Sequence, residues 1–192
     1  MGRPPIAKEK ILSAARQIVE RDGAGALTFD ELVRESGITR GGITYHYPTK
    51  EDVLRSLLEA DFRQWDDAEA ALTPGDCDPE TARLLGFIRT LTAQDESHRR
   101  FLCGMLSAAT LDPSLMDPCR AELRELLGRK QWTERDLRLH LVHLAAEGLM
   151  WQELFQMYAM PAPARVRLVA LMEELARQWG AGQAPRKIAK EA

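Results

Sequence analysis

The chain has 192 residues, of which 45% are apolar, so it is long enough for a small module joined to a larger domain with its own core. It contains no apolar run long enough for a membrane span and no signal-peptide pattern, and its three cysteines show no metal-ligand spacing, so we expect a cytoplasmic protein with reduced thiols. The net charge of −3 excludes a uniformly basic protein, although residues 1–55 carry nine Lys/Arg against eight Asp/Glu and residues 56–180 carry fourteen against twenty. That distribution suits a small DNA-reading module on an acidic body.

Apolar residues recur at helical spacing along the chain, and no convincing segment alternates as a strand does, so we expect an all-α fold. The first helix is predicted over residues 6–22, and Gly23 ends it. Thr28, followed three residues later by Glu31, predicts a capping box at the next helix. Further helices are predicted from Thr49 past Trp65 and over residues 79–92, 99–110, 113–127, 133–158 and 164–179, of which 133–158 is apolar on nearly every side and should be buried all round.

Two short helices lie between the first helix and the long helix that starts near Thr49. The first runs from Thr28 to Ser36 and the second, capped by Thr39, runs to Tyr45, with a tight turn at Gly37 between them. This is the helix-turn-helix plan, whose second helix enters the major groove of DNA. The anchors of the crossing should be buried, and they are Leu32, Val33, Ile38, Ile43 and Tyr47.

The residues expected to face the DNA divide into two sets. Small or polar side chains should face the groove, namely Arg40, Gly41, Gly42 and Thr44. Phosphate donors should flank the second helix, namely Thr28, Thr39, Tyr45, His46 and Lys50. Two adjacent glycines are costly in a helix, at about 1 kcal/mol each. Either the backbone approaches DNA closely there, or a short capped helix simply tolerates them.

The stretch of residues 28–54 resembles the DNA-binding signature of the tetracycline-repressor (TetR) family, in Gly37-Ile38-Thr39, Tyr45-His46-Tyr47 and Pro48-x-Lys50-Glu51. The resemblance covers roughly residues 6–60 and implies that Tyr45 and Lys50 grip phosphates while Arg40 and Thr44 lie in the groove. Arg3, in the N-terminal arm, either reaches an adjacent minor groove or belongs to a disordered start.

The C-terminal part resembles one subgroup of the same family, in residues 144–149 and in residues 153–155 followed by Pro161. The resemblance implies that the last two helices form a four-helix homodimer interface. Small residues at Ala145, Ala146 and Gly148 would permit close helix approach. A two-fold dimer would present two reading heads to a pseudo-palindromic operator in double-stranded DNA.

An effector pocket between helices is the least defined expectation. Its candidate lining residues are Phe62, Trp65, Phe87, Phe101, Met105, Met116, His143, Glu147, Met150, Trp151 and Phe155. For each apolar residue taken singly, ordinary core is the simpler interpretation. His140, His143 and Glu147 share one helical face, which permits a metal site, but packing at an interface or in a polar wall is the simpler reading. We therefore expect no metal and no cofactor.

These expectations combine into one assignment. Residues 1–49 form a DNA-binding domain, residues 50–180 an effector-binding and dimerisation domain, and residues 181–192 a flexible tail. The function expected is a ligand-responsive transcription regulator, most simply a repressor released by a small molecule. The sequence contains no nucleophile elbow, phosphate loop or HExxH pattern, so an enzyme is not expected.

Overall fold

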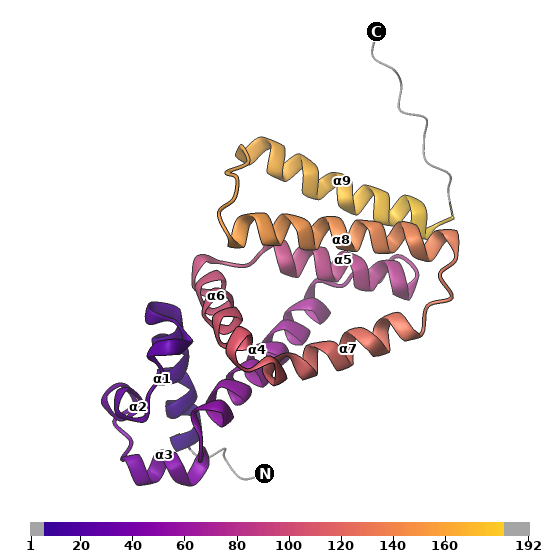
Figure 1. Cartoon of the computed structure of the whole chain (residues 1–192). Coiled ribbons are helices and arrows are strands. Elements are labelled where there is room, and N and C mark those ends of the chain that lie inside the picture. The colour runs from indigo at the N-terminus through magenta and orange to yellow at the C-terminus, as the bar shows by residue number, and fades with distance from the viewer. Residues whose placement is uncertain (1–5, 183–192) are drawn as a thin grey trace. The chain divides into compact units, whose positions relative to one another are not determined.

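The computed structural model describes residues 6–182, and this part of the chain consists of helices and their connections, without strands (Figure 1). The contacts between Cα atoms divide it into two compact units. One unit comprises the chain up to Gln64 together with Asp95–Glu125, and the other comprises Trp65–Gln94 together with the chain from Leu126. None of the helices in residues 6–182 is long and apolar enough to cross a membrane.

The first unit contains a three-helix head and the segments that pack on it. Its elements are α1 (Ile6–Asp22), a 3₁₀ turn η1 (Ala24–Ala26), α2 (Phe29–Ser36), α3 (Arg40–His46), most of α4 (Lys50–Leu72), α6 (Glu96–Leu111), a second turn η2 (Pro113–Met116) and most of α7 (Asp117–Gly128). One core joins the apolar face of α1 to α3, α4 and α6, and its fully buried side chains include Ile11, Ile18, Ile43, Val53 and Phe101. The three-helix head therefore shares one core with α4 and α6.

Local chemistry sets the ends of the short helices in this unit. The Glu31 backbone N–H donates to the Thr28 side chain at 3.2 Å, and Gly37 ends α2 in the left-handed region at φ 68°, which a residue without Cβ adopts freely. The predicted capping box is only half formed. The Glu31 carboxylate pairs with Arg21 and Arg34 instead of the Thr28 backbone, because two guanidinium groups offer it stronger partners than one amide. A complete box occurs at Thr133, where α8 begins.

The second unit is a packed group of three long helices, α5 (Pro79–Thr92), α8 (Glu134–Leu154) and α9 (Ala162–Gly180), joined by the C-terminal part of α4. Its buried core includes Leu85, Ile88, Leu139, Val142 and Met172. Each of these three helices packs against the other two, and Figure 1 shows them side by side.

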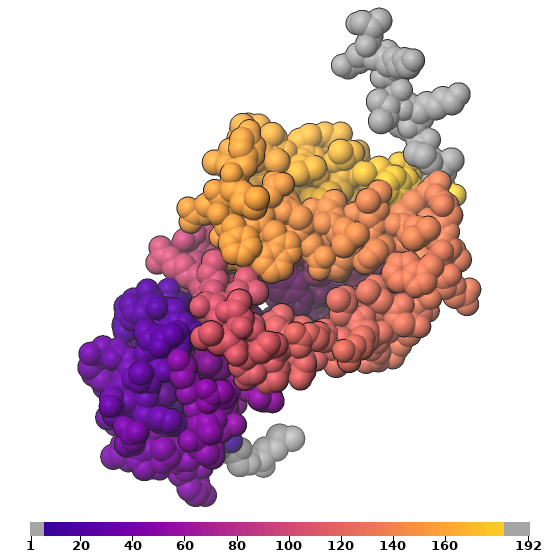
Figure 2. Space-filling model, viewed as in Figure 1, coloured from indigo at the N-terminus to yellow at the C-terminus, as the bar shows by residue number. Residues whose placement is uncertain are grey.

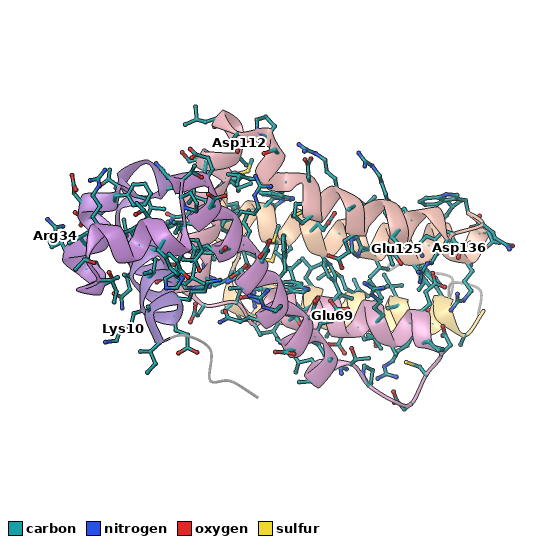
Figure 3. All side chains as sticks on the ribbon, turned by 90° about the horizontal axis from the view of Figure 1, so that it is seen from below. Lys10, Arg34, Glu69, Asp112, Glu125 and Asp136 are labelled. Carbon is teal, nitrogen blue, oxygen red and sulfur yellow. The ribbon has the colours of Figure 1, made fainter. Side chains whose placement is uncertain are left out.

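Ion pairs fasten the surface of this three-helix group. Arg89 of α5 donates to both carboxylate oxygens of Glu173 on α9, at 3.0 and 2.8 Å. Figure 3 shows Glu69 between α4 and α5, where its side chain and backbone lie against Gly86. The planar two-point contact between Arg89 and Glu173 fixes the relative orientation of the two side chains. Both the apolar core and this ion pair therefore determine how α5 packs on α9.

Two helices differ from the sequence prediction. The segment 113–127 is a 3₁₀ turn followed by α7, because Pro118 has no N–H and a single helix starting at residue 113 would need it for an internal bond. The predicted helix 133–158 ends at Leu154, and Gln156 adopts a left-handed φ of 49°. Nor is α8 buried all round, since α5 and α9 cover only part of its circumference.

Candidate nucleic-acid interface and ligand-binding region

The helix pair α2 and α3 is fixed by the anchors that the sequence predicted. Leu32, Ile43 and Tyr47 are buried, and Val33 and Ile38 pack against the same core while partly exposed. Burial raises the pKa of the Tyr47 phenol, which therefore stays neutral at physiological pH. These anchors thus fix one face of α3 against the core of the first unit.

Few side chains extend from the outer face of α3. Tyr45 is 83% exposed, and the Arg40 side chain is 62% exposed. The Thr44 hydroxyl donates to the backbone oxygens of Arg40 at 3.1 Å and Gly41 at 3.3 Å, so its proton is used within the helix. Of the residues predicted to face the groove, Arg40 is therefore the one with a long polar side chain.

The two glycines of α3 have different surroundings. A Cβ at Gly42 would meet the Ile38 side chain at 2.9 Å and the Thr39 hydroxyl at 3.3 Å, so packing inside the chain accounts for that glycine. A Cβ at Gly41 would meet nothing within 4 Å, and Gly41 has ordinary helical backbone angles. Among the described residues nothing within 4 Å therefore requires a glycine at position 41. Close approach to DNA and simple tolerance in a short capped helix both stay open as reasons for Gly41.

The predicted phosphate donors lie at the ends of α2, α3 and α4. The Thr28 and Thr39 hydroxyls each accept a backbone N–H of their own helix at 3.2 Å, while Lys50, at the start of α4, reaches the Gly25 carbonyl at 3.4 Å. His46 lies against Tyr45, with ring centroids 5.0 Å apart. Arg3 lies outside the described residues.

A contact that the sequence did not reveal involves Arg40. Its Nη1 donates to the Asp30 carboxylate at 2.7 Å, and its guanidinium carbon lies 5.5 Å from the centre of the Phe29 ring. Asp30 and Phe29 belong to the first turn of α2. Asp30 and Arg40 are ten positions apart in the sequence, so only the crossing of the two helices brings them together.

The second unit gathers aromatic rings from α4, α5 and α8. The rings of Trp65 and Phe87 are 5.7 Å apart, and Phe87 stacks on His143 at 4.2 Å with 22° between the planes. His143 lies 5.9 Å from His140, which meets Trp132 edge-on at 5.4 Å. We call these five residues the ring ladder. Trp132 was not among the predicted lining residues, because it lies in the loop before α8.

Glu147 supplies the negative charge beside the ring ladder. Its Oε1 lies 3.4 Å from His143 Nε2, and this contact lowers the pKa of the Glu147 carboxyl, so the group is ionised at neutral pH. Burial lowers the pKa of the His140 imidazole. Within residues 6–182, His, Cys, Asp and Glu side chains form no group of three or more that could hold a metal ion.

The other predicted pocket residues divide between the units. Phe101 and Met105 are fully buried in the core of the first unit, with Arg16 4.3 Å above the Phe101 ring, and Phe62 packs against the same core. Met116 is half-buried at the end of η2. These four residues are in a different unit from Trp65, Phe87, His143, Glu147, Met150 and Trp151.

On α9, Val166 and Leu171 are exposed. On α8 and at its end, exposed apolar side chains follow one face of the helix, namely Leu137, Leu141, Leu144, Trp151 and Phe155. We call this set the apolar stripe. Trp151 and Phe155 stack at 5.8 Å, and Phe155 is 57% exposed. In Figure 2, α8 and α9 form a continuous part of the surface. Trp151 thus lies on this surface instead of in an enclosed core.

Family comparisons cover most of the chain. Residues 11–57 match the family described as bacterial regulatory proteins of the tetR family, and residues 81–177 match the family described as tetracyclin repressor-like, C-terminal domain. The second match alone spans half of the chain.

Individual relatives are more distant. The regulator QacR of Staphylococcus aureus is 33% identical over 58 residues, which are 30% of this chain and 31% of QacR. The regulator LmrA of Bacillus subtilis is 25% identical over 129 residues, 66% of each chain. These matches therefore span less than two thirds of the relatives' own length.

Solved structures share the fold. The multidrug-binding protein EbrR, solved with ethidium, has a TM-score of 0.62 at 18% identity, with 90% of this chain and 99% of that chain covered. GusR of Salmonella enterica has a TM-score of 0.65 at 14% identity, with 94% and 98% covered.

Proposed function

Because the chain belongs to the tetracycline-repressor (TetR) family, we propose that it is a ligand-responsive DNA-binding transcription regulator, a repressor that a small molecule releases from its operator. The observation that carries the proposal is the outer face of α3, where Arg40 and Tyr45 are exposed beside Gly41, whose added Cβ would meet no atom of the described residues within 4 Å. Residues 1–49 would read DNA in the cytoplasm, and residues 50–180 would bind the effector and the partner subunit.

The apolar stripe supports a homodimer formed through α8 and α9. Contiguous apolar surface of this kind is unfavourable in water and typical of an obligate interface. A two-fold axis through the stripe would give the dimer two copies of α3. The operator would then be an inverted repeat whose half-sites match the spacing of the two heads.

The ring ladder and Glu147 support a planar aromatic cation as the effector. Stacked rings offer π faces, and an ionised carboxylate in a half-buried position favours a positive partner. Structures of the similar protein EbrR hold ethidium and malachite green, which have this chemistry.

The long helix α4 would couple effector binding to release from DNA. It begins at Lys50, beside the DNA-reading head, and carries Trp65 of the ring ladder. An effector that binds one position of α4 more tightly than another shifts the population toward that position. Release from DNA follows if the favoured position no longer lets both heads fit the operator.

Selection from a library of random-sequence DNA duplexes tests DNA binding. The purified protein should enrich an inverted repeat at physiological salt. Lys50→Ala or Tyr45→Phe should weaken binding to all sequences and flatten the salt dependence, whereas Arg40→Ala should relax the preference at one base position per half-site. A folded dimer that enriches no sequence would contradict the proposal.

Titration with ethidium tests the effector class, with the quenching of tryptophan fluorescence as readout. Glu147→Gln keeps the size of the side chain and removes its charge, so it should weaken ethidium binding by about tenfold, a change of ~1.4 kcal/mol. Ethidium should also release the protein from the selected operator. Glu174→Gln, an exposed acid on α9, is the matched control and should bind ethidium as the parent does.

A further inference from the structure

We propose that Asp30 and Phe29 of α2 hold the Arg40 side chain in one orientation, and that this arrangement makes Arg40 selective for guanine in each half-site of the operator. The inference rests on the proposed DNA-binding function and extends it to residues outside the reading helix. Asp30 and Phe29 are positioning residues in this proposal, because they act on DNA through Arg40.

The sequence of α3 places most of the base reading on Arg40. Gly41 and Gly42 have no side chains, and the Thr44 hydroxyl proton is bonded to the backbone of its own helix. Tyr45, the other exposed side chain, lies toward the end of the helix beside His46. Because α3 has so few side chains that could contact bases, its base selectivity depends strongly on the orientation of Arg40.

Two contacts define that orientation. The Asp30 carboxylate accepts from Arg40 Nη1 at 2.7 Å, and the guanidinium lies over the Phe29 ring at 5.5 Å. Phe29 packs against the core of the first unit, so its ring is a fixed platform. One contact acts on an edge of the planar guanidinium and the other on its face. Together they remove rotamer freedom that binding would otherwise have to remove.

The donors that remain match guanine. A guanidinium has five N–H donors in a planar fork, and the contact with Asp30 uses Nη1. Nε and Nη2 keep donors for a base, and guanine presents two acceptors, O6 and N7, on its major-groove edge. Adenine offers an acceptor beside a donor at the same place, which a fixed pair of N–H donors would meet poorly.

Asp30 adds little to folding, which makes it a suitable residue to change. Its side chain is 87% exposed and that of Arg40 is 62% exposed, and ion pairs this exposed contribute little to stability. A carboxylate facing the phosphate backbone also repels DNA of any sequence. Asp30 should therefore lower the affinity for all DNA while it raises the selectivity for guanine.

Asp30→Asn gives opposite changes in these two properties. We expect the variant to bind random-sequence duplex more tightly than the parent at equal salt. Its preference for guanine at the Arg40 position of the selected operator should fall on the order of tenfold. A fold defect would weaken both properties together, so it would be recognised, and a thermal melt confirms that the variant is folded.

Two further variants distinguish the loss of the Asp30–Arg40 contact from the loss of one negative charge. Glu9→Gln removes one exposed carboxylate from the first turn of α1 and should leave the guanine preference unchanged. In an Arg40→Ala background, Asp30→Asn should no longer change base preference, because the residue through which it acts is gone.

The outcomes distinguish the two proposals. If the parent protein selects an operator and Asp30→Asn keeps the full guanine preference, the inference is overturned and the regulator assignment stands. An operator that shows no guanine preference dependent on Arg40 has the same consequence. If the parent protein selects no sequence, both proposals fail.

Discussion

The exposed face of α3 and the exposed faces of α8 and α9 differ in the chemistry of the side chains that they present to solvent. On α3 the exposed side chains are polar or absent, as at Arg40 and Gly41. On α8 the exposed side chains include leucines and aromatic residues, as at Leu141 and Trp151. Both faces belong to helices with a well-packed opposite side, so neither results from a poorly formed core.

The difference indicates two kinds of partner. A face of arginine, tyrosine and bare backbone has donors to offer and little apolar area, which suits the polar, anionic surface of DNA. A stripe of leucine and aromatic side chains has apolar area and few donors, which suits another apolar stripe. One chain thus has one face for each partner, and substitutions on the two faces should have separable effects.

The largest effect should come from a charge in the apolar stripe. Leu141→Glu places a carboxylate where two subunits would meet, and an uncompensated buried charge costs about 3–5 kcal/mol. We expect a monomer by sedimentation, and more than about a hundredfold weaker binding to a two-half-site duplex.

Leu123→Glu is the control for that substitution. Leu123 is also an exposed leucine, but it lies on α7 outside the apolar stripe. It should leave both the oligomeric state and the binding to DNA unchanged. A dimeric Leu141→Glu protein would show that the stripe is not the interface.

The next largest effect should come from Gly41 on α3, where one substitution should change stability and DNA binding in opposite directions. Gly41→Ala should raise the free energy of unfolding by about 0.5–1 kcal/mol, since alanine is the better helix former and its Cβ meets nothing in the chain. The same Cβ would keep the backbone from DNA and weaken operator binding about tenfold, ~1.4 kcal/mol. Gly128→Ala, at the end of α7, is the control that should not alter DNA binding.

Cap residues in the two units give a smaller effect and a direct comparison. Thr28→Ala and Thr133→Ala each remove a hydroxyl that accepts a backbone N–H, and each should lower the free energy of unfolding by about 1 kcal/mol in a denaturant titration. Only Thr28→Ala should also weaken DNA binding. Equal losses of DNA binding in both variants would mean that general stability, not the position of Thr28, controls it.

The smallest effect is a pH dependence of stability from His98 in the first unit. Burial lowers the pKa of its imidazole, against the opposing influence of Asp61, whose carboxylate lies 3.5 Å away. The folded protein therefore binds this proton more weakly than the unfolded chain. The stabilisation is present above the ordinary histidine pKa of about 6.5 and is lost as pH falls toward the lowered value.

His98→Gln should therefore reduce the fall in Tm between neutral and mildly acidic pH. The other charged groups around the imidazole are Arg16, Glu20 and Asp95, and they remain in place in the variant. An unchanged slope of Tm against pH would mean that other groups dominate the titration.

Most of the head could be predicted from local chemistry. Helix periodicity located α1, the glycine at residue 37 located the turn, and threonines located the starts of α2 and α3. These features depend on residues within one or two turns of each other, which a sequence displays directly. The family resemblance then assigned roles to positions that the pattern alone left open.

Other features depend on interactions that the local capping and periodicity patterns do not include. Glu31 had the spacing of a capping box but pairs with Arg21, from another helix. The predicted helix 113–127 is divided into η2 and α7, because Pro118 lacks the N–H that a continuous helix would need there.

The sequence by itself determined the all-α class, the helix-turn-helix and the amphipathic helices of the body, because each follows from periodicity and capping along the chain. Only the tertiary structure decided which residues from distant positions meet. It brought Asp30 to Arg40, Phe87 to His143 and Arg89 to Glu173, and it left one side of α8 uncovered. Such contacts depend on how helices cross, and the crossing is set by the whole core, which no single segment specifies.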